Sequence, residues 1–299
     1  MNVLLLREPS LDTQDRYETA FKEAGYCAKS VPVLETVHDN VDGLQSIIWN
    51  GPAHLGIGGV VITSKRSCDT WREGLRTIRQ NKDLKAWSAA GLESWCTIPF
   101  YVVGPATASA LSDVFTEFKD LGLNSVDIRG DSCGNAASLA PFILEDMKSV
   151  PRKLLYLTGD KNRDTLPRIL NDGGIELETL QVYTTRGSPS FQENLARTLH
   201  SMSQGVKHWW IVYFAPSTAA FVTPTLQNHF TFAKDTGKEM TRSDTNSPEN
   251  TLPIAKVAAI GPTTDTYLRG ELHLLVDVMA QKPTPEDVVK EITRYDHSK

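Results

Sequence analysis

Short apolar runs alternate along the chain with stretches in which apolar residues recur at helical spacing. Each run is almost continuously apolar, which is typical of parallel strands that helices cover on both faces. Strands that alternate with helices indicate βαβ units, so the pattern predicts α/β domains with doubly wound parallel sheets. The clearest runs predict strands at Val3–Leu6, Gly59–Thr63, Tyr101–Val103, Lys153–Leu157, Trp210–Phe214 and Lys256–Ile260.

These runs also recur with a long period. Three pairs keep their order and nearly the same offset: Val3 with Leu154 (151, from 154 minus 3), Val61 with Val212 (151, from 212 minus 61) and Tyr101 with Ala258 (157, from 258 minus 101). A duplicated α/β unit explains this regularity better than a chance likeness between generic βα segments. The polar segment 234–253 is the expected source of the longer last offset, and we expect it to be a flexible loop.

Length and composition agree with two ordinary domains. The 299 residues fit about two units of roughly 150 residues, and 40% apolar with 22% charged residues is usual for a globular protein. No apolar run approaches the roughly 18 residues of a membrane-spanning helix, and the N-terminus lacks the features of a signal peptide. We therefore expect a cytoplasmic protein without a membrane partner.

Charge and cysteine spacing exclude further classes of protein. A net charge of −5 disfavours nucleic acid as a partner, because nucleic-acid-binding domains are usually basic along one face. A local cleft can still be basic and hold a small anion. The four cysteines form no C-x-x-C pair and the histidines no metal-binding pair, so we expect free thiols and no metal site.

The residues that follow the predicted strands are the candidates for a binding site, because ligands of doubly wound sheets lie beyond the carboxyl ends of the strands. Hydroxyl residues and Gly-Pro steps stand there at helix starts, where backbone amides and the helix dipole favour an anion. Basic residues lie beside them, which suits a ligand with several carboxylates or phosphates. Each hydroxyl residue alone is equally well explained as a helix cap. The candidates are Arg7, Ser64, Lys65, Thr107, Ser217, Thr263 and Thr264.

Common catalytic motifs are absent from the sequence. It has no phosphate-binding G-x-x-x-x-G-K-[ST] loop, no G-x-G-x-x-G after a strand and no G-x-S-x-G elbow. An enzyme with this sequence would work with few titrating groups. It would act mainly by holding a reactive substrate in the right shape.

Nine segments, in order along nearly the whole chain, resemble those of uroporphyrinogen-III synthases. They are V-L-L-L-R, V-I-T-S-K-R-S, Y-V-V-G-P-A-T-A-S, G-D-S-C-G-N-A-A-S-L-A, L-P-R-I-L-N-D-G-G-I-E-L, V-Y-T-T-R, F-A-P-S, A-A-I-G-P-T-T and K-P-T-P-E-D-V-V. The resemblance implies two similar α/β domains, residues 1–34 with 186–299 and residues 35–185, with the active site in the cleft between them. It also implies a two-stranded linker at Val33–Val37 and Val182–Arg186.

The resemblance implies a reaction as well. Members of this family close hydroxymethylbilane, a linear tetrapyrrole with eight carboxylates, to uroporphyrinogen III in heme biosynthesis. Water is lost and ring D is inverted through a spiro intermediate, without a cofactor or metal. We expect a monomeric hydro-lyase that receives its substrate by transient hand-over from porphobilinogen deaminase.

Particular residues match the family's site. Tyr183 matches a tyrosine that assists departure of the substrate hydroxyl; a phenol is protonated at neutral pH and can donate a hydrogen bond. Tyr17 matches another cleft tyrosine, although packing of its helix explains it equally well. Two departures stand out: Ala215 replaces a serine frequent in relatives, which leaves that contact to Ser217, and Lys65 replaces a proline.

Two other functions remain open at this point. A two-domain protein that closes on an anion without chemistry would share the cleft and the helix termini. A glycosyl- or phosphoryl-transfer enzyme would need a phosphate loop or an acidic metal-binding pair, and the sequence shows neither.

Overall fold

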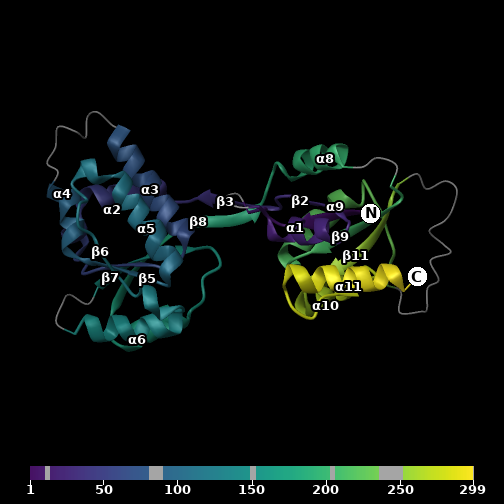
Figure 1. Ribbon diagram of the computed structural model, residues 1–299. Coiled ribbons are helices and arrows are strands. Elements are labelled where there is room, and N and C mark those ends of the chain that lie inside the picture. The colour runs from purple at the N-terminus through teal and green to yellow at the C-terminus, as the bar shows by residue number, and fades with distance from the viewer. Residues whose placement is uncertain (11–13, 81–89, 149–152, 203–205, 236–251, 299) are drawn as a thin grey trace. The chain divides into compact units, whose positions relative to one another are not determined.

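The computed structural model describes residues 1–10, 14–80, 90–148, 153–202, 206–235 and 252–298 (Figure 1). The chain forms two compact units: unit 1 is Met1–Glu35 with Arg186–Lys299, and unit 2 is Thr36–Thr185. Each unit contains a six-stranded sheet. Most of the predicted loop, residues 236–251, lies outside the described residues. Lys234, at its start, forms a bridge with Leu274.

Unit 1 has the strand order β10-β11-β9-β1-β2, with β12 beside β11, and these pairs are parallel. Its elements are β1 (Asn2–Leu6), α1 (Arg16–Glu23), β2 (Cys27–Ser30), α8 (Phe191–Ser201), β9 (His208–Tyr213), α9 (Pro216–Leu226), β10 (Thr231–Phe232), β11 (Ile254–Ala259), α10 (Pro262–Gly270), β12 (Val278–Met279) and α11 (Pro285–His297).

Unit 2 has the strand order β3-β8-β7-β4-β5-β6, and the pairs from β8 to β6 are parallel. Its elements are β3 (Leu34–His38), α2 (Val41–Asn50), β4 (Val60–Ile62), α3 (Lys65–Gln80), α4 (Ala90–Glu93), β5 (Pro99–Val102), α5 (Pro105–Glu117), β6 (Asp127–Arg129), α6 (Ala136–Asp146), β7 (Lys153–Gly159), α7 (Thr165–Asp172) and β8 (Glu176–Gly187), with 3₁₀ turns at Pro52–Leu55, Ser94–Thr97, Lys119–Leu121 and Asp131–Cys133. The six predicted strands are confirmed as β1, β4, β5, β7, β9 and β11, with ends shifted by at most two residues.

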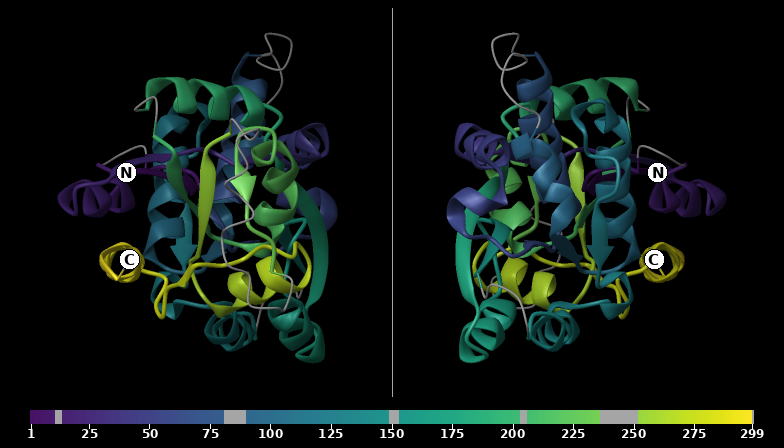
Figure 2. Two further views of the ribbon diagram at one scale, coloured as in Figure 1. Left: turned by 90° about the vertical axis from the view of Figure 1, so that its right-hand side faces the viewer. Right: turned by 90° about the vertical axis from the view of Figure 1, so that its left-hand side faces the viewer.

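Both faces of each sheet are buried, which explains the continuous apolar runs. In β4, Val60 and Ile62 pack with α2, α3 and α5, whereas Val61 packs with α6 and α7 on the other face (Figure 1). Successive side chains of a strand point to opposite faces, so a strand covered twice must be apolar throughout. In unit 1, α8, α9 and α10 cover one face. Helices α1 and α11 pack side by side on the other, as both views of Figure 2 show.

The sequence repeat has a structural counterpart. The order β2-β1-β9-β11-β12 in unit 1 corresponds to β8-β7-β4-β5-β6 in unit 2, so each repeated run occupies the same place in its sheet. Helices follow the same rule: α1 and α7 begin 149 residues apart (165 minus 16), and α2 and α8 begin 150 apart (191 minus 41). Each sheet therefore combines strands from both halves of the sequence.

The chain passes from one unit to the other within β3 and within β8. Related hydrogen bonds hold the two passages: the amide of Asp39 donates to the Val182 carbonyl in unit 2, and that of Ser188 donates to the Val33 carbonyl in unit 1. The donors are 149 residues apart (188 minus 39), and so are the acceptors (182 minus 33). That these segments act as a linker between the two units stays a prediction.

A buried ion pair fastens α11 to the sheet of unit 1. Lys256 Nζ lies 2.5 Å from Asp296 Oδ1, and Asp296 Oδ2 accepts hydrogen bonds from Trp210 Nε1 at 3.0 Å and from the Tyr26 hydroxyl at 2.9 Å. Burial alone would raise the pKa of Asp296, but the hydrogen bonds from these three side chains hold it below its ordinary value.

Replacement of Asp296 by Asn should therefore destabilise unit 1 by about 3 kcal/mol, because Lys256 would keep a buried charge without its partner. A carboxyl whose pKa is lowered in the folded state stabilises it above the ordinary pKa, and this stabilisation is lost as the pH falls through the folded pKa. The difference between wild type and variant should therefore shrink as the pH falls through the lowered pKa of Asp296, and disappear once that carboxyl is protonated in the folded state. Urea unfolding, with hydrogen exchange in β9 and β11 as its probe, measures the loss of stability and its dependence on pH.

Lys290→Ala, which removes an exposed pair with Glu291 on the same helix, is the control and should cost less than about 0.5 kcal/mol. Equal losses for the two variants at neutral pH would contradict the account of the buried pair.

Candidate active site

The candidates of unit 2 lie at one edge of its sheet. Because β7, β4 and β5 are parallel neighbours, the turns that follow them emerge together at the carboxyl edge of the sheet. At the end of β4, the Ser64 hydroxyl accepts a hydrogen bond from the Arg66 amide at 3.2 Å and so caps α3. Lys65 and Arg66 are exposed in the first turn of this helix. Their charges lie where the amides of a helix N-terminus already favour an anion.

Tyr183 lies at the same edge, on β8. Residue pairs between β7 and β8 run in register as far as Thr158 with Gln181, and the next pair is Gly159 with Tyr183. Val182 is therefore the extra residue of a β-bulge. A bulge bends the strand and re-aims the side chain that follows it. Val182 and Tyr183 consequently both pack against the same apolar cluster of unit 2, although they are consecutive.

The ring of Tyr183 has two close neighbours. It packs directly on Gly159, where a Cβ atom would lie 2.3 Å from the ring. The guanidinium carbon of Arg66 lies 5.7 Å from the ring centroid, within the range of a cation–π contact. The structure therefore brings Ser64, Lys65, Arg66 and Tyr183 to one place.

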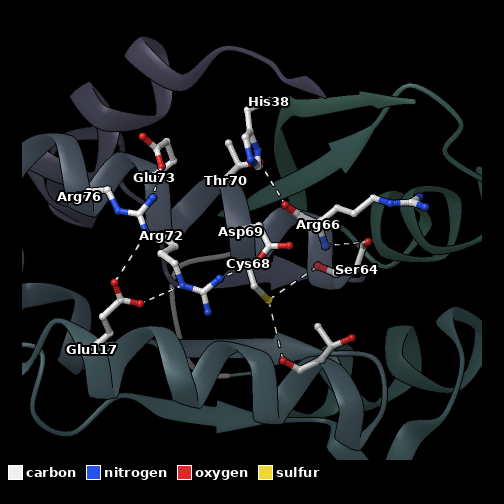
Figure 3. A network of polar contacts seen from close by, with 11 residues as sticks. His38, Ser64, Arg66, Cys68, Asp69, Thr70, Arg72, Glu73, Arg76 and Glu117 are labelled. Carbon is white, nitrogen blue, oxygen red and sulfur yellow. Dashed lines mark hydrogen bonds and ion pairs between the residues drawn. The ribbon is translucent and has the colours of Figure 1, made fainter. Parts of the chain in front are cut away.

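Thr107 has a buried side chain, and a substrate contact through its backbone amide stays a prediction. It is the third residue of α5, is only 6% exposed and faces the core. Its carbonyl and that of Ser64 lie 3.9 and 3.7 Å from the Cys68 sulfur, which joins the first turns of α3 and α5 (Figure 3). Burial raises the pKa of the Cys68 thiol to about 12, so it is protonated at neutral pH and is not a nucleophile.

In unit 1, the structure brings Arg7 and Tyr17 together. Arg7 Nη1 lies 2.6 Å from Asp15 Oδ2, and its guanidinium carbon lies 4.9 Å from the centre of the Tyr17 ring. Tyr17 packs edge-on against Phe214, and its hydroxyl donates to the Pro283 carbonyl at 3.1 Å. Burial raises the pKa of Tyr17, so this hydroxyl is also protonated at neutral pH. These contacts show a packing role for Tyr17, and a contact with a substrate stays a prediction.

The other unit 1 candidates follow β9 and β11. Strand β9 lies between β1 and β11 and is parallel to both. Ser217 and Thr263, each the second residue of its helix, are exposed at this carboxyl edge. Thr264 is 3% exposed and faces the core. It is the repeat counterpart of Thr107, with the offset of 157 (264 minus 107). Neither buried hydroxyl lies on the surface that a ligand would contact.

Sequence reasoning missed Asp15 and Gly159. Asp15 accepts the Arg7 guanidinium and caps α1 through the amides of Tyr17 and Glu18. Although burial opposes this, the hydrogen bonds leave the pKa of Asp15 below its ordinary value, so it stays charged beside Arg7. The pattern Asp15-x-x-Glu18 before an amphipathic helix is a capping signal that could have revealed it. Gly159 carries no such signal, because its role depends on the bulge in the neighbouring strand.

Within the part of the chain that the structure describes, no cluster of three or more His, Cys, Asp or Glu side chains could hold a metal ion. The four cysteines are unpaired. Among the described helices, none combines the length and apolarity needed to cross a membrane.

Comparison with known proteins identifies the family. The sequence model described as Uroporphyrinogen-III synthase HemD matches residues 15–290. The chain is 25% identical to the uroporphyrinogen-III synthases of Saccharomyces cerevisiae, covering 100% of this chain and 98% of that protein, and of Schizosaccharomyces pombe, covering 99% and 98%. A solved uroporphyrinogen-III synthetase from Helicobacter pylori is 16% identical, covers 97% of this chain and 96% of its own, and superposes with a TM-score of 0.47. The match of the family model over nearly the whole length shows that this chain belongs to the uroporphyrinogen-III synthase family.

Proposed function

We propose that this protein cyclises hydroxymethylbilane to uroporphyrinogen III, with loss of water and inversion of ring D, and without a cofactor. Membership of the family supports the reaction. The observation in the structure that supports it best is the position of Tyr183 at the carboxyl edge of unit 2, beside Arg66 and the exposed first turn of α3. A phenol at this place is a hydrogen-bond donor among groups that bind anions.

The substrate supplies most of its own reactivity. The electrons of a pyrrole nitrogen expel the hydroxyl of the hydroxymethyl group, and the Tyr183 phenol assists by donating a hydrogen bond as the carbon–oxygen bond breaks. The resulting cation is attacked by the substituted carbon of ring D, which gives a spiro intermediate. The bond from this ring D carbon to the bridge carbon of ring C then breaks, which leaves a cation at the bridge carbon. The free carbon of ring D attacks that cation, so ring D is inverted. Loss of the proton from this carbon restores the pyrrole and balances the proton that the departing hydroxide takes up to leave as water. The protein must hold the chain in the shape that brings these two carbons together.

Carboxylate binding is assigned to the two carboxyl edges. Lys65 and Arg66 supply charge in unit 2, Arg7 supplies it in unit 1, and Ser64, Ser217 and Thr263 supply hydroxyls. Thr107 and Thr264 have buried side chains, so we assign them the binding of carboxylates through the amides of their helix N-termini. We also propose a cytoplasmic monomer that takes hydroxymethylbilane by transient hand-over from porphobilinogen deaminase, because the free substrate closes by itself to the type I isomer.

A coupled assay tests the function. Porphobilinogen and porphobilinogen deaminase generate hydroxymethylbilane, the protein is added without metal or cofactor, and the oxidised porphyrin isomers are separated by chromatography. The product should shift from type I to type III. Type I product alone, from folded protein, would refute the proposal and favour a protein that binds anions without chemistry.

Tyr183→Phe should lower kcat by about 10²-fold, because it removes the donor to the departing hydroxyl and keeps the ring. Thermal stability should change little, since the contacts with Gly159 and Arg66 involve the ring. Initial rates in the coupled assay and a melting curve measure the two effects. Full activity in this variant would remove Tyr183 from the mechanism.

Gly159→Ala should lower kcat by at least about tenfold, because the new methyl group would occupy the place of the Tyr183 ring and displace it. Gly43→Ala in α2 is the control, since a Cβ at that position meets no atom within 4 Å. The control should be as active as wild type and slightly more stable, by about 0.5 kcal/mol. If Gly159→Ala is as active as Gly43→Ala, the contact with Gly159 does not position the tyrosine.

A further inference from the structure

The bulge that aims Tyr183 is held by one buried hydroxyl, that of Thr70 in the second turn of α3. Thr70 Oγ1 lies 3.0 Å from the Val182 carbonyl, 3.1 Å from the Arg66 carbonyl and 2.8 Å from His38 Nδ1. Figure 3 shows Thr70 on α3 with two of these partners, Arg66 and His38. Thr70 is therefore linked to the bulge residue that precedes Tyr183 and to the residue whose guanidinium lies over the tyrosine ring.

The single proton of the Thr70 hydroxyl couples the direction of these hydrogen bonds to the tautomer of His38. Two of the three partners are carbonyls, which only accept, and the Thr70 hydroxyl has a single proton to give. When it donates to a carbonyl, His38 must donate to it, so His38 carries a proton on Nδ1. His38 lies on β3, the strand beside β8. Thr70 thereby connects α3 to both of the strands through which the chain leaves unit 2.

Ordinary satisfaction of buried polar groups does not account for this arrangement. The Val182 carbonyl already accepts the amide of Asp39 at 2.8 Å. The Arg66 carbonyl, inside α3, accepts the amide four residues on. A threonine in a helix often bonds back to the carbonyl four residues earlier. That tendency does not explain the contacts of Thr70 with Val182 and His38.

The other half of the repeat has a different kind of contact at the equivalent place. The counterpart of Thr70 is Phe221 on α9, with the offset of 151 (221 minus 70), and the counterpart of His38 is Gly187, with an offset of 149 (187 minus 38). There the Phe221 ring packs directly on Gly187. Unit 1 thus has an apolar contact where unit 2, which carries Tyr183, has three polar contacts of one hydroxyl.

We propose that Thr70, with His38, is a positioning residue for the reaction: it fixes the Val182 bulge and the first turn of α3, and so holds the Tyr183 hydroxyl and the Arg66 guanidinium in the geometry for loss of the substrate hydroxyl. This inference rests on the proposed function. Thr70 is buried and acts only through its neighbours.

The test compares Thr70→Val, which keeps the shape and removes the hydroxyl, with Thr70→Ser, which keeps the hydroxyl. The matched control is Thr77→Val on the same helix, because Thr77 bonds back to the Glu73 carbonyl at 3.0 Å in the same way. Thr70→Val should lower kcat at least about tenfold, with KM changed less than twofold and a larger share of type I product. Thr70→Ser and Thr77→Val should stay within about twofold of wild type.

A double-mutant cycle separates positioning from general damage. If Thr70 acts through Tyr183, Thr70→Val should have little further effect on kcat once Tyr183 is Phe. Equal relative losses in both backgrounds, or wild-type kcat in Thr70→Val, would overturn the inference. Wild-type protein that makes no type III isomer would instead refute the proposed function, and the inference with it. Melting curves show that each variant is folded before rates are compared.

Discussion

The central strands of both sheets are parallel and buried on both faces, and the positions of the candidate residues depend on this constraint. Parallel neighbours can be joined only by crossovers, so the turn after each strand emerges at the same edge. The turns after β1, β9 and β11 in unit 1 and after β7, β4 and β5 in unit 2 lead into helix N-termini. An edge of this kind favours anions, and the duplication provides two of them in one chain.

The chemistry at these edges needs few titrating groups. Burial keeps the Cys68 thiol, which lies beside the candidates of unit 2, protonated, and Asp15 forms an ion pair with Arg7. The exposed side chains at these edges include the positive charges of Lys65 and Arg66 and the hydroxyl groups of Ser217 and Thr263. This inventory suits a substrate with many carboxylates that carries its own leaving group, because the task of the protein is then to hold a shape and to assist one departure. The position of the Tyr183 side chain depends on the backbone, through the bulge at Val182.

The sequence could predict the strands, the repeat and the edge at which the candidate residues lie, because each depends on local apolar runs and their order. Burial of Thr107 could also have been read: Thr107, Leu111 and Val114 recur at the spacing of one helix face, and all three are buried. The bulge could not be predicted, since it depends on the register between β7 and β8, which are separated by a helix. The contacts of Gly159 and Thr70 with β8 follow from that register, so they were equally out of reach.

Hydrogen exchange with and without uroporphyrinogen III, under reducing conditions, tests the central claim that both carboxyl edges bind the tetrapyrrole. The account predicts slower exchange in the first turns of α3 and α5 and around Tyr183 in unit 2, and in the first turns of α9 and α10 in unit 1. Exchange at the opposite ends of the same strands should not change. Protection confined to one unit, or found at the amino ends of the strands, would contradict the account.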